Sequence, residues 1–202
     1  MNTRIRLQML GFAGALSACA QTTIEPASFQ SAYQPMLAPQ ETVLPKRCVA
    51  VSGITYKNGL ENTLVGKRFL ENHKKPPEAI HMTGNLSDWV RASATEMFRR
   101  AGFNTQDPSA PRLTLQLTDI AVSENIYVNS GYNGRVTLDA TLLNAQGQPC
   151  WNDTEAGLAQ NYGHSGSAIN YQETVNHALD RALMALLADK NFQKAACGAC
   201  RP

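Results

Sequence analysis

The chain has 202 residues, and 18 lysines and arginines against 16 aspartates and glutamates give it a formal net charge of +2. The basic residues are scattered along the chain in pairs such as Lys46-Arg47 and Arg99-Arg100. Because proteins that bind nucleic acid or anionic membranes normally gather such residues on one face, we expect neither a nucleic-acid partner nor a strongly charged one.

The first 18 residues predict a signal peptide that is cleaved. Arg4 and Arg6 precede an apolar run from Met9 to Ala18, which is too short to span a bilayer as a helix. The run ends in Leu16-Ser17-Ala18-Cys19, the pattern at which bacterial lipoproteins are cut and acylated. We expect Cys19 to carry a diacylglycerol and an N-acyl chain, and we expect no other cofactor. The alternative is an ordinary secretory signal with a cysteine there by chance.

The residues after this cysteine indicate the membrane in which the protein is anchored, and they predict a flexible tether. Lipoproteins retained in the inner membrane usually carry Asp after the cysteine, whereas this chain has Ala20. We therefore expect the acyl chains to anchor the protein in the inner leaflet of the outer membrane, where it faces the periplasm. Residues 19–47 are rich in Gln, Thr, Ser, Ala and Pro without a periodic apolar pattern, which predicts a flexible tether. A single domain over residues 48–202 follows.

The first half of this domain predicts one strand, a long loop and one helix. Cys48 to Thr55 is short and rich in β-branched residues, as strands are. Residues 57–84 lack periodicity and contain Pro76-Pro77, so we expect a loop that either binds a partner or is simply solvated. A helix follows, which Asn85 or Ser87 caps and Gly102 ends.

The second half predicts three antiparallel strands and a second helix. Residues 113–118 and 136–142 alternate strictly between apolar and polar, and a turn at 144–147 leads into a strand from Cys150 to about Tyr162. Asn170 with Glu173 resembles a capping box before a helix with one apolar side. The order predicts an α+β fold: a two-layer sandwich with two helices on one face of a small mixed four-stranded sheet. Its other face is polar, lined by Thr114, Gln116, Thr118, Thr137, Asp139 and Thr141.

Several segments together resemble the YajG family of Gram-negative lipoproteins over most of the chain from Cys48 to Phe192. They are the signal and tether, Phe98-Arg-Arg-Ala-Gly-Phe103, the strands and turn from Arg135 to Asn144, and the helix from Thr174 to Leu183. The element order is also similar to the lipoprotein partner of the lipopolysaccharide translocon and to accessory lipoproteins of envelope transporters. The resemblance implies a non-enzymatic accessory or scaffold role in an envelope assembly, with an envelope protein as partner and no catalytic residue. A lipid or lipopolysaccharide transport accessory is the alternative.

Four cysteines besides Cys19 predict disulfide bonds, because their number is even and the periplasm is oxidising. They are Cys48, Cys150, Cys197 and Cys200. A right-handed crossover would place the starts of the first and last strands at the end of the sheet where the last helix exits. Three pairings remain open, and we favour bonds from the two tail cysteines to Cys48 and Cys150. A Cys197-x-x-Cys200 redox pair or a zinc site is the weaker alternative, because the motif follows a helix instead of beginning one.

Enzymatic alternatives depend on a single serine. Gly163-His164-Ser165-Gly166-Ser167 lies between a strand and a helix, where hydrolases place a nucleophile. Its last position is not glycine, and the downstream acids and His177 all belong to the next helix, so a serine hydrolase using Ser165 is the alternative of another class. The histidines (His73, His81, His164, His177) and the pair Asp153 and Glu155 lack the spacing of a metal site, and we expect none.

Overall fold

We obtained a computed structural model of the chain, which describes residues 27–32, 51–57, 60, 64–69, 75–105, 107, 109–125 and 131–200. The predicted signal peptide, Cys19, Cys48 and His73 lie outside these residues. Within them, no helix is long and apolar enough to cross a membrane.

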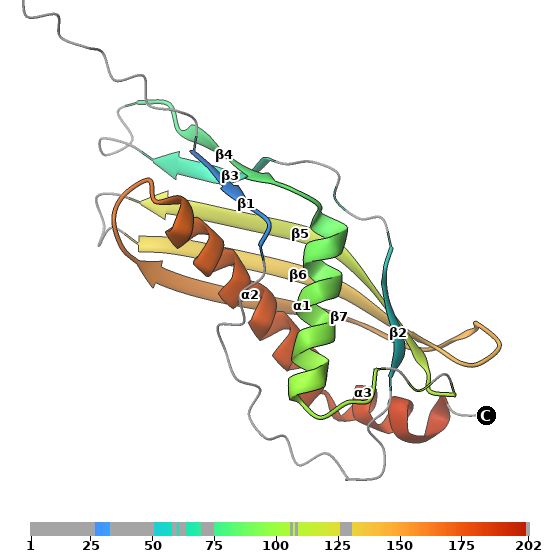
Figure 1. Ribbon diagram of the computed structural model, residues 1–202. Coiled ribbons are helices and arrows are strands. Elements are labelled where there is room, and N and C mark those ends of the chain that lie inside the picture. The colour runs from blue at the N-terminus through green and yellow to red at the C-terminus, as the bar shows by residue number, and fades with distance from the viewer. Residues whose placement is uncertain are drawn as a thin grey trace, which may run out of the picture.

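One mixed sheet forms the first layer of the fold, and helices packed on one face form the second (Figure 1). The sheet has seven strands in the order β1-β4-β3-β5-β6-β7, with β2 paired to β5 off this path. The strands are β1 (Ala27–Gln30), β2 (Ser52–Tyr56), β3 (Leu64–Phe69), β4 (Glu78–Thr83), β5 (Arg112–Asn125), β6 (Gly131–Leu143) and β7 (Pro149–Tyr162).

Three long antiparallel strands, β5, β6 and β7, make up the centre and one side of the sheet. Two short strands share the remaining edge of β5, and both run parallel to it: β2 beside residues 112–115 and β3 beside residues 122–125. Strand β4 pairs antiparallel with β3, and β1 pairs parallel with β4. The first strand expected in the domain, β2, is thus parallel to the next strand expected, β5.

The α+β class is confirmed, but the small four-stranded sheet with two helices is wrong. Strands β3 and β4 come from residues 57–84, which the sequence predicts as a loop, and β1 comes from the predicted tether over 19–47. These strands are short, and each buries only one or two side chains, such as Phe29, Val65 and Ile80. Such short strands carry too little apolar alternation to stand out in a sequence. The folded part of the chain therefore begins well before residue 48.

Helix α1 (Leu86–Arg100) matches the prediction closely. The Asn85 side chain accepts a hydrogen bond from the Asp88 backbone N–H at 3.1 Å, which caps the first turn. After the last turn, Gly102 has φ of +85°, a left-handed conformation that favours glycine. Phe103 then packs back on Phe98, with ring centroids 4.9 Å apart.

Helix α2 (Ala168–Ala188) packs its apolar stripe on the sheet, as expected. The buried stripe includes Val175, Leu179, Ala182, Leu183 and Leu186. Its predicted capping box is wrong: the cap is Ser167, whose hydroxyl accepts from the Asn170 backbone N–H. The carboxylate of Glu173 instead accepts a hydrogen bond from Asn161 at 3.1 Å. The short helix α3 (Lys190–Lys194) and a π-helical turn, η2 (Ala195–Ala199), complete the chain described.

Candidate functional site

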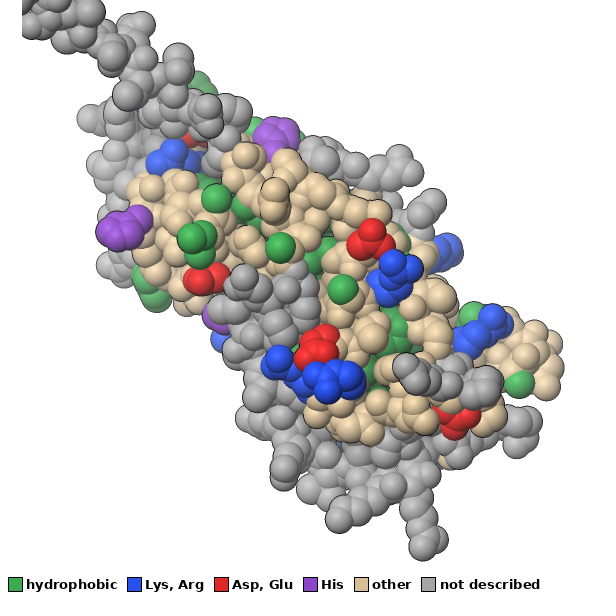
Figure 2. Space-filling model, viewed as in Figure 1, with side chains coloured by type: hydrophobic (Ala, Val, Ile, Leu, Met, Phe, Trp, Pro, Cys, Tyr) green, Lys and Arg blue, Asp and Glu red, His purple; other side chains and the backbone are tan. Residues whose placement is uncertain are grey.

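The face of the sheet opposite the helices carries the polar side chains that the sequence predicts, and it is turned away from the viewer in Figures 1 and 2. The six polar residues predicted to line it are half-buried or exposed, and the register places them side by side on β5 and β6. Cross-strand contacts continue this array: Thr154 of β7 donates to Asp139 of β6 at 2.7 Å, and Arg135 of β6 pairs with Asp119 of β5 at 2.6 Å. We call the outward side chains of β5, β6 and β7 the outer face. Its ordered array of hydroxyls, amides and charges suits recognition of another polar protein surface.

Exposed apolar side chains occur where the outer face meets strand β7. Leu158 is 62% exposed and Tyr162 is 65% exposed, and both point outward in register with residues of β6. Because β7 is the last strand in the sheet order, one of its edges has no neighbouring strand among the described residues. An edge strand with outward apolar residues is a common place for a partner to bind.

Side chains of the same chain occupy some of the hydrogen-bonding groups of β7. The Asp153 carboxylate accepts from the Thr154 N–H at 2.8 Å, and the Asn161 side chain accepts from the Tyr162 N–H at 2.9 Å. Arg181 on α2 donates to the Leu158 carbonyl. These contacts lower the tendency of β7 to pair indiscriminately, as protected edge strands of other proteins do.

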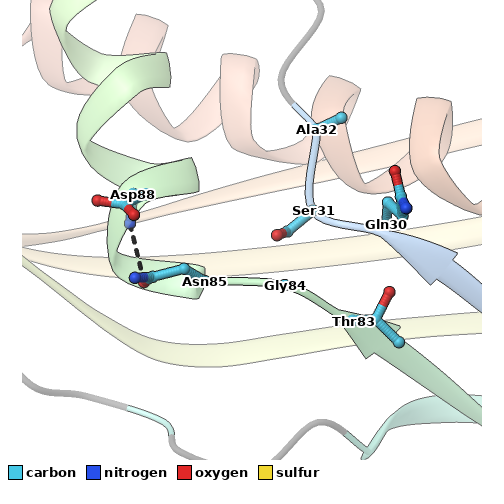
Figure 3. Close-up of a pocket in the computed structure, with 7 residues that line it drawn as sticks. All are labelled: Gln30, Ser31, Ala32, Thr83, Gly84, Asn85 and Asp88. Carbon is cyan, nitrogen blue, oxygen red and sulfur yellow. Dashed lines mark hydrogen bonds between the residues drawn. The ribbon is translucent and has the colours of Figure 1, made fainter.

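A cleft of about 350 Å³ lies where β1 and β4 end and α1 begins (Figure 3). Its lining is largely polar and comprises Gln30, Ser31, Ala32, Thr83, Gly84, Asn85 and Asp88. The backbone N–H of Ser31 donates to the Thr83 carbonyl at 2.7 Å, which joins the two strands at the floor. Asn85 already caps the helix that opens here, so its N-terminus does not by itself mark an anion site. The polar lining does not suit an acyl chain.

The loop that carries Ser165 is held by buried charged residues. The Glu124 carboxylate accepts from the Gly166 N–H at 3.0 Å and from the Tyr171 hydroxyl. Burial and the hydrogen bond to Glu124 raise the pKa of the Tyr171 phenol, so it stays protonated and donates. The hydroxyl of Ser165 accepts from the Arg68 guanidinium at 3.0 Å.

This geometry does not suit Ser165 as a nucleophile. A guanidinium is permanently protonated and cannot take the serine proton, and no described histidine or carboxylate hydrogen-bonds to this hydroxyl. Sequence reasoning missed Arg68 and Glu124, which organise this loop. The alternation Ile120-Ala-Val122-Ser-Glu124 was the available signal, because it places Glu124 on the same side as two core residues.

The cysteines form a bridge across the end of the sheet where β7 begins. Cys150 is disulfide-bonded to Cys200, with Cα atoms 5.5 Å apart, and Cys197 is also disulfide-bonded. Because Cys200 is bonded to Cys150, the Cys197-x-x-Cys200 motif is not a redox pair in this structure, and these thiols are not free to bind zinc. Neither Cys19 nor Cys48 belongs to the described residues.

Three carboxylates lie close enough together to hold a metal ion. Oxygen atoms of Asp153, Glu155 and Asp189 lie within 4.8 Å of one another, so Asp189 joins the pair of acids that the sequence analysis considered. Asp189 caps α3 by accepting from the Phe192 N–H at 3.0 Å. Burial raises the pKa of Glu155, and repulsion by the negative charges of Asp153 and Asp189 raises it further. Of the histidines described, His81, His164 and His177, none belongs to this group.

The fold of this chain has a counterpart among solved structures, whereas its sequence matches no family model. No protein-family model matches the chain, and no curated protein matches it, so the resemblance to the YajG family stays a prediction. A crystal structure of protein XCC0632 from Xanthomonas campestris, described as DUF330, has a TM-score of 0.55 at 10% sequence identity. The match covers 79% of this chain and 92% of that protein. The two proteins share a fold.

Two more distant structures also align. A candidate lipoprotein from Caulobacter crescentus CB15 has 13% identity and a TM-score of 0.40, covering 54% of this chain and 81% of that one. A protein described only as uncharacterized has 13% identity and a TM-score of 0.36, covering 80% and 94% of the two chains.

Proposed function

We propose that the protein is a non-enzymatic lipoprotein of the outer membrane that acts as an accessory or scaffold component of a cell-envelope assembly. Acyl chains on Cys19 would hold it in the inner leaflet, and an envelope protein would bind its outer face. The observation that carries the proposal is the polar outer face of β5, β6 and β7, with Leu158 exposed at its margin.

Other features of the chain support this proposal. The sequence Leu16-Ser17-Ala18-Cys19 is typical of an acylation site, and Ala20 is typical of release to the outer membrane. A flat, hydrogen-bonded sheet face suits binding to a folded partner, since it offers ordered donors and acceptors without a deep cavity. The polar cleft beside α1 gives no support to a lipid or lipopolysaccharide carrier. The contact between Arg68 and Ser165 gives none to a serine hydrolase.

Acylation is tested first in cells. Metabolic labelling with a clickable fatty acid should mark the wild-type protein, and the label should be lost in Cys19→Ser. The wild type should fractionate with outer membranes. Label retained by Cys19→Ser, or an inner-membrane location of the labelled protein, would overturn this part of the proposal.

Binding is tested by photocrosslinking from the outer face of the intact lipoprotein. A photoreactive residue at Asn152 or Thr154 should capture one and the same envelope protein. The matched control is Arg91, which is exposed on α1 on the other side of the molecule. Capture of that protein equally from Arg91, or no protein captured from either β7 position, would contradict an interface on the outer face. A fluorophosphonate label that disappears in Ser165→Ala would instead establish the hydrolase.

A further inference from the structure

One end of the sheet brings together residues that are far apart in the sequence. The strand register aligns the first residues of β1, β4 and β6 with the last residues of β3, β5 and β7, and we call this the proximal end (Figure 1). The pairs that define it are Ala27 with Ile80, Glu78 with Arg68, Arg68 with Glu124, Asn125 with Gly131, and Gly131 with Tyr162. The chain therefore enters the fold, at Ala27, at the same end where β7 leaves the sheet for α2.

Two of the most exposed large apolar side chains lie at this end. Tyr162 ends β7 and is 65% exposed, and Ile169, in the first turn of α2, is 66% exposed. Only the loop 163–167 separates the two elements that carry them. Leu158 is similarly exposed but lies four residues earlier on β7, about 13 Å further from the proximal end.

Strand β1 fixes the distance between the predicted lipid anchor and the fold. Phe29 is buried, and its carbonyl accepts from the Thr83 hydroxyl at 3.1 Å. Gln172 of α2 donates to the Ala32 carbonyl at 2.9 Å, so both the sheet and a helix hold this segment. Seven residues, 20–26, separate Cys19 from Ala27. Even fully extended, this stretch spans at most about 29 Å, whereas a tether reaching to residue 48 would span about 100 Å.

The acidic side chains described at the proximal end share one arginine. Glu78 and Glu124 both pair with Arg68, at 3.2 Å and 3.1 Å, so Arg68 offsets one of their two negative charges. Tyrosine is amphipathic and is enriched at membrane interfaces, where its ring contacts acyl chains and its hydroxyl stays hydrated. Isoleucine gains by leaving water altogether.

We propose that the proximal end of the domain lies against the bilayer, with Tyr162 and Ile169 in contact with phospholipid. The inference rests on the proposed function, because it requires acylation of Cys19. The short connection keeps these two side chains at high effective concentration near the lipid, so individually weak contacts suffice to orient the domain. The outer face then stands across the membrane plane and stays accessible to a protein in the periplasm.

Photocrosslinking to lipid tests this orientation. The acylated full-length protein is reconstituted in vesicles of phosphatidylethanolamine and phosphatidylglycerol, with a photoreactive residue at Tyr162, Ile169 or Leu158. Capture of phospholipid, measured by mass spectrometry, should be at least several-fold greater at Tyr162 and Ile169 than at Leu158. The acylation state of each sample is measured on the same spectra. A protein without acyl chains would show that the proposed function has failed, whereas an acylated protein with equal capture at all three positions would overturn the orientation alone.

A longer connection tests why the domain is oriented. Inserting a flexible Gly-Ser segment of about 20 residues between Cys19 and Ala27 leaves the exposed side chains unchanged but lowers their effective concentration at the lipid. Lipid capture at Tyr162 and Ile169 should then fall several-fold toward the value at Leu158. Undiminished capture in this acylated variant would overturn the argument that β1 sets the orientation.

Discussion

Glu124 and Arg68 form a cross-strand ion pair inside the protein, between the parallel strands β5 and β3. Their Cα atoms are register partners, and the Arg68 Nε lies 3.1 Å from the Glu124 carboxylate. The contact is electrostatic, because the Nε–H does not point at the oxygen and has no hydrogen-bond acceptor. The side chain of Glu124 is 1% exposed and that of Arg68 is 12% exposed. The pair joins the short strands to the long ones and also holds the 163–167 loop.

Removing the charge of Glu124 should therefore destabilise the fold. Breaking a buried ion pair from one side typically costs about 3–5 kcal/mol, because the other charge stays buried without its partner. Glu124→Gln should lower the unfolding free energy by about 3 kcal/mol, at the lower end of this range, because Arg68 keeps its contact with Glu78. Urea unfolding measures the loss.

The matched control for this variant is an ion pair on the surface. Asp119 and Arg135 lie only 2.6 Å apart, but both are exposed on the outer face. Solvent screens such pairs, so Asp119→Asn should cost less than about 1 kcal/mol. Equal losses in the two variants would show that burial does not decide the strength of the Glu124 pair.

The disulfide bond between Cys150 and Cys200 should contribute substantially to stability. The two residues are 50 positions apart in the sequence, and closing a loop of this size restricts the unfolded chain. The double variant Cys150→Ala/Cys200→Ala should lose about 2–5 kcal/mol of unfolding free energy under oxidising conditions. Because Cys197 is also disulfide-bonded, a reductant should destabilise this double variant further. A variant as stable as the wild type would contradict the contribution of this bond.

Local signals explain which elements the sequence predicts well. Helix α1 carries its start and its end within the segment itself, in the Asn85 cap, in Gly102 and in Phe103. The long strands β5 and β6 alternate over many residues, so the polar outer face follows from the pattern alone. No comparable signal marks β1, which is a strand because β4 supplies its hydrogen bonds, while α2 holds the chain just after it at Ala32.

Non-local relations explain what the sequence leaves unpredicted at the candidate site. The exposure of Leu158 and Tyr162 depends on β7 being the last strand in the sheet order, which no segment of the sequence reveals. The inward position of Glu124 follows from the register shift between Leu117 and Asp119, which reverses the alternation halfway along β5. The reversed alternation can be seen in the sequence, but the pairing of this part of β5 with β3 cannot.

Glu155 should make stability fall as the pH rises. Burial, with Asp153 and Asp189 nearby, raises its pKa above the ordinary value of 4.5, so the folded state binds the proton more tightly than the unfolded state. Stability is therefore lost as the pH rises from about 4.5 through the folded pKa. Glu155→Gln should be more stable than the wild type at pH 7, and this advantage should shrink toward pH 4. Unfolding measured across this range tests it.

Glu96 provides a control of opposite sign. Hydrogen bonds from Arg99 and Arg100 lower its pKa from 4.5 to about 2 on the exposed surface of α1. Its contribution to stability is thus present above about pH 4.5 and is lost as the pH falls toward 2. Glu96→Gln should be slightly less stable than the wild type at pH 7. If both glutamine variants changed stability in the same direction at pH 7, the opposite environments of these carboxylates would be contradicted.

Gly157 should tolerate no side chain, because α2 crosses β7 directly over it. A Cβ atom at this position would overlap the backbone carbonyl of Ala178 and would lie 2.5 Å from the backbone nitrogen of Ala182. Backbone atoms of a packed helix cannot move aside as a side chain can, so Gly157→Ala must lift α2 from the sheet. We expect the unfolding free energy to fall by about 3 kcal/mol or more, at or beyond the upper end of the usual cost of adding atoms to a packed core.

Two further glycines make this a graded test. At Gly134 a Cβ would lie 2.8 Å from the Thr174 methyl group and 3.0 Å from the Thr174 carbonyl oxygen, so its backbone contact is less close than at Gly157 and Gly134→Ala should cost less than Gly157→Ala. At Gly198 nothing lies within 4 Å, and an alanine in this helical turn should leave stability unchanged or raise it by up to about 1 kcal/mol. Thermal unfolding of the three variants should rank them in this order. A Gly157→Ala protein as stable as Gly198→Ala would refute the close contact between α2 and β7, because an added methyl group at Gly157 would then meet no backbone atom of the helix.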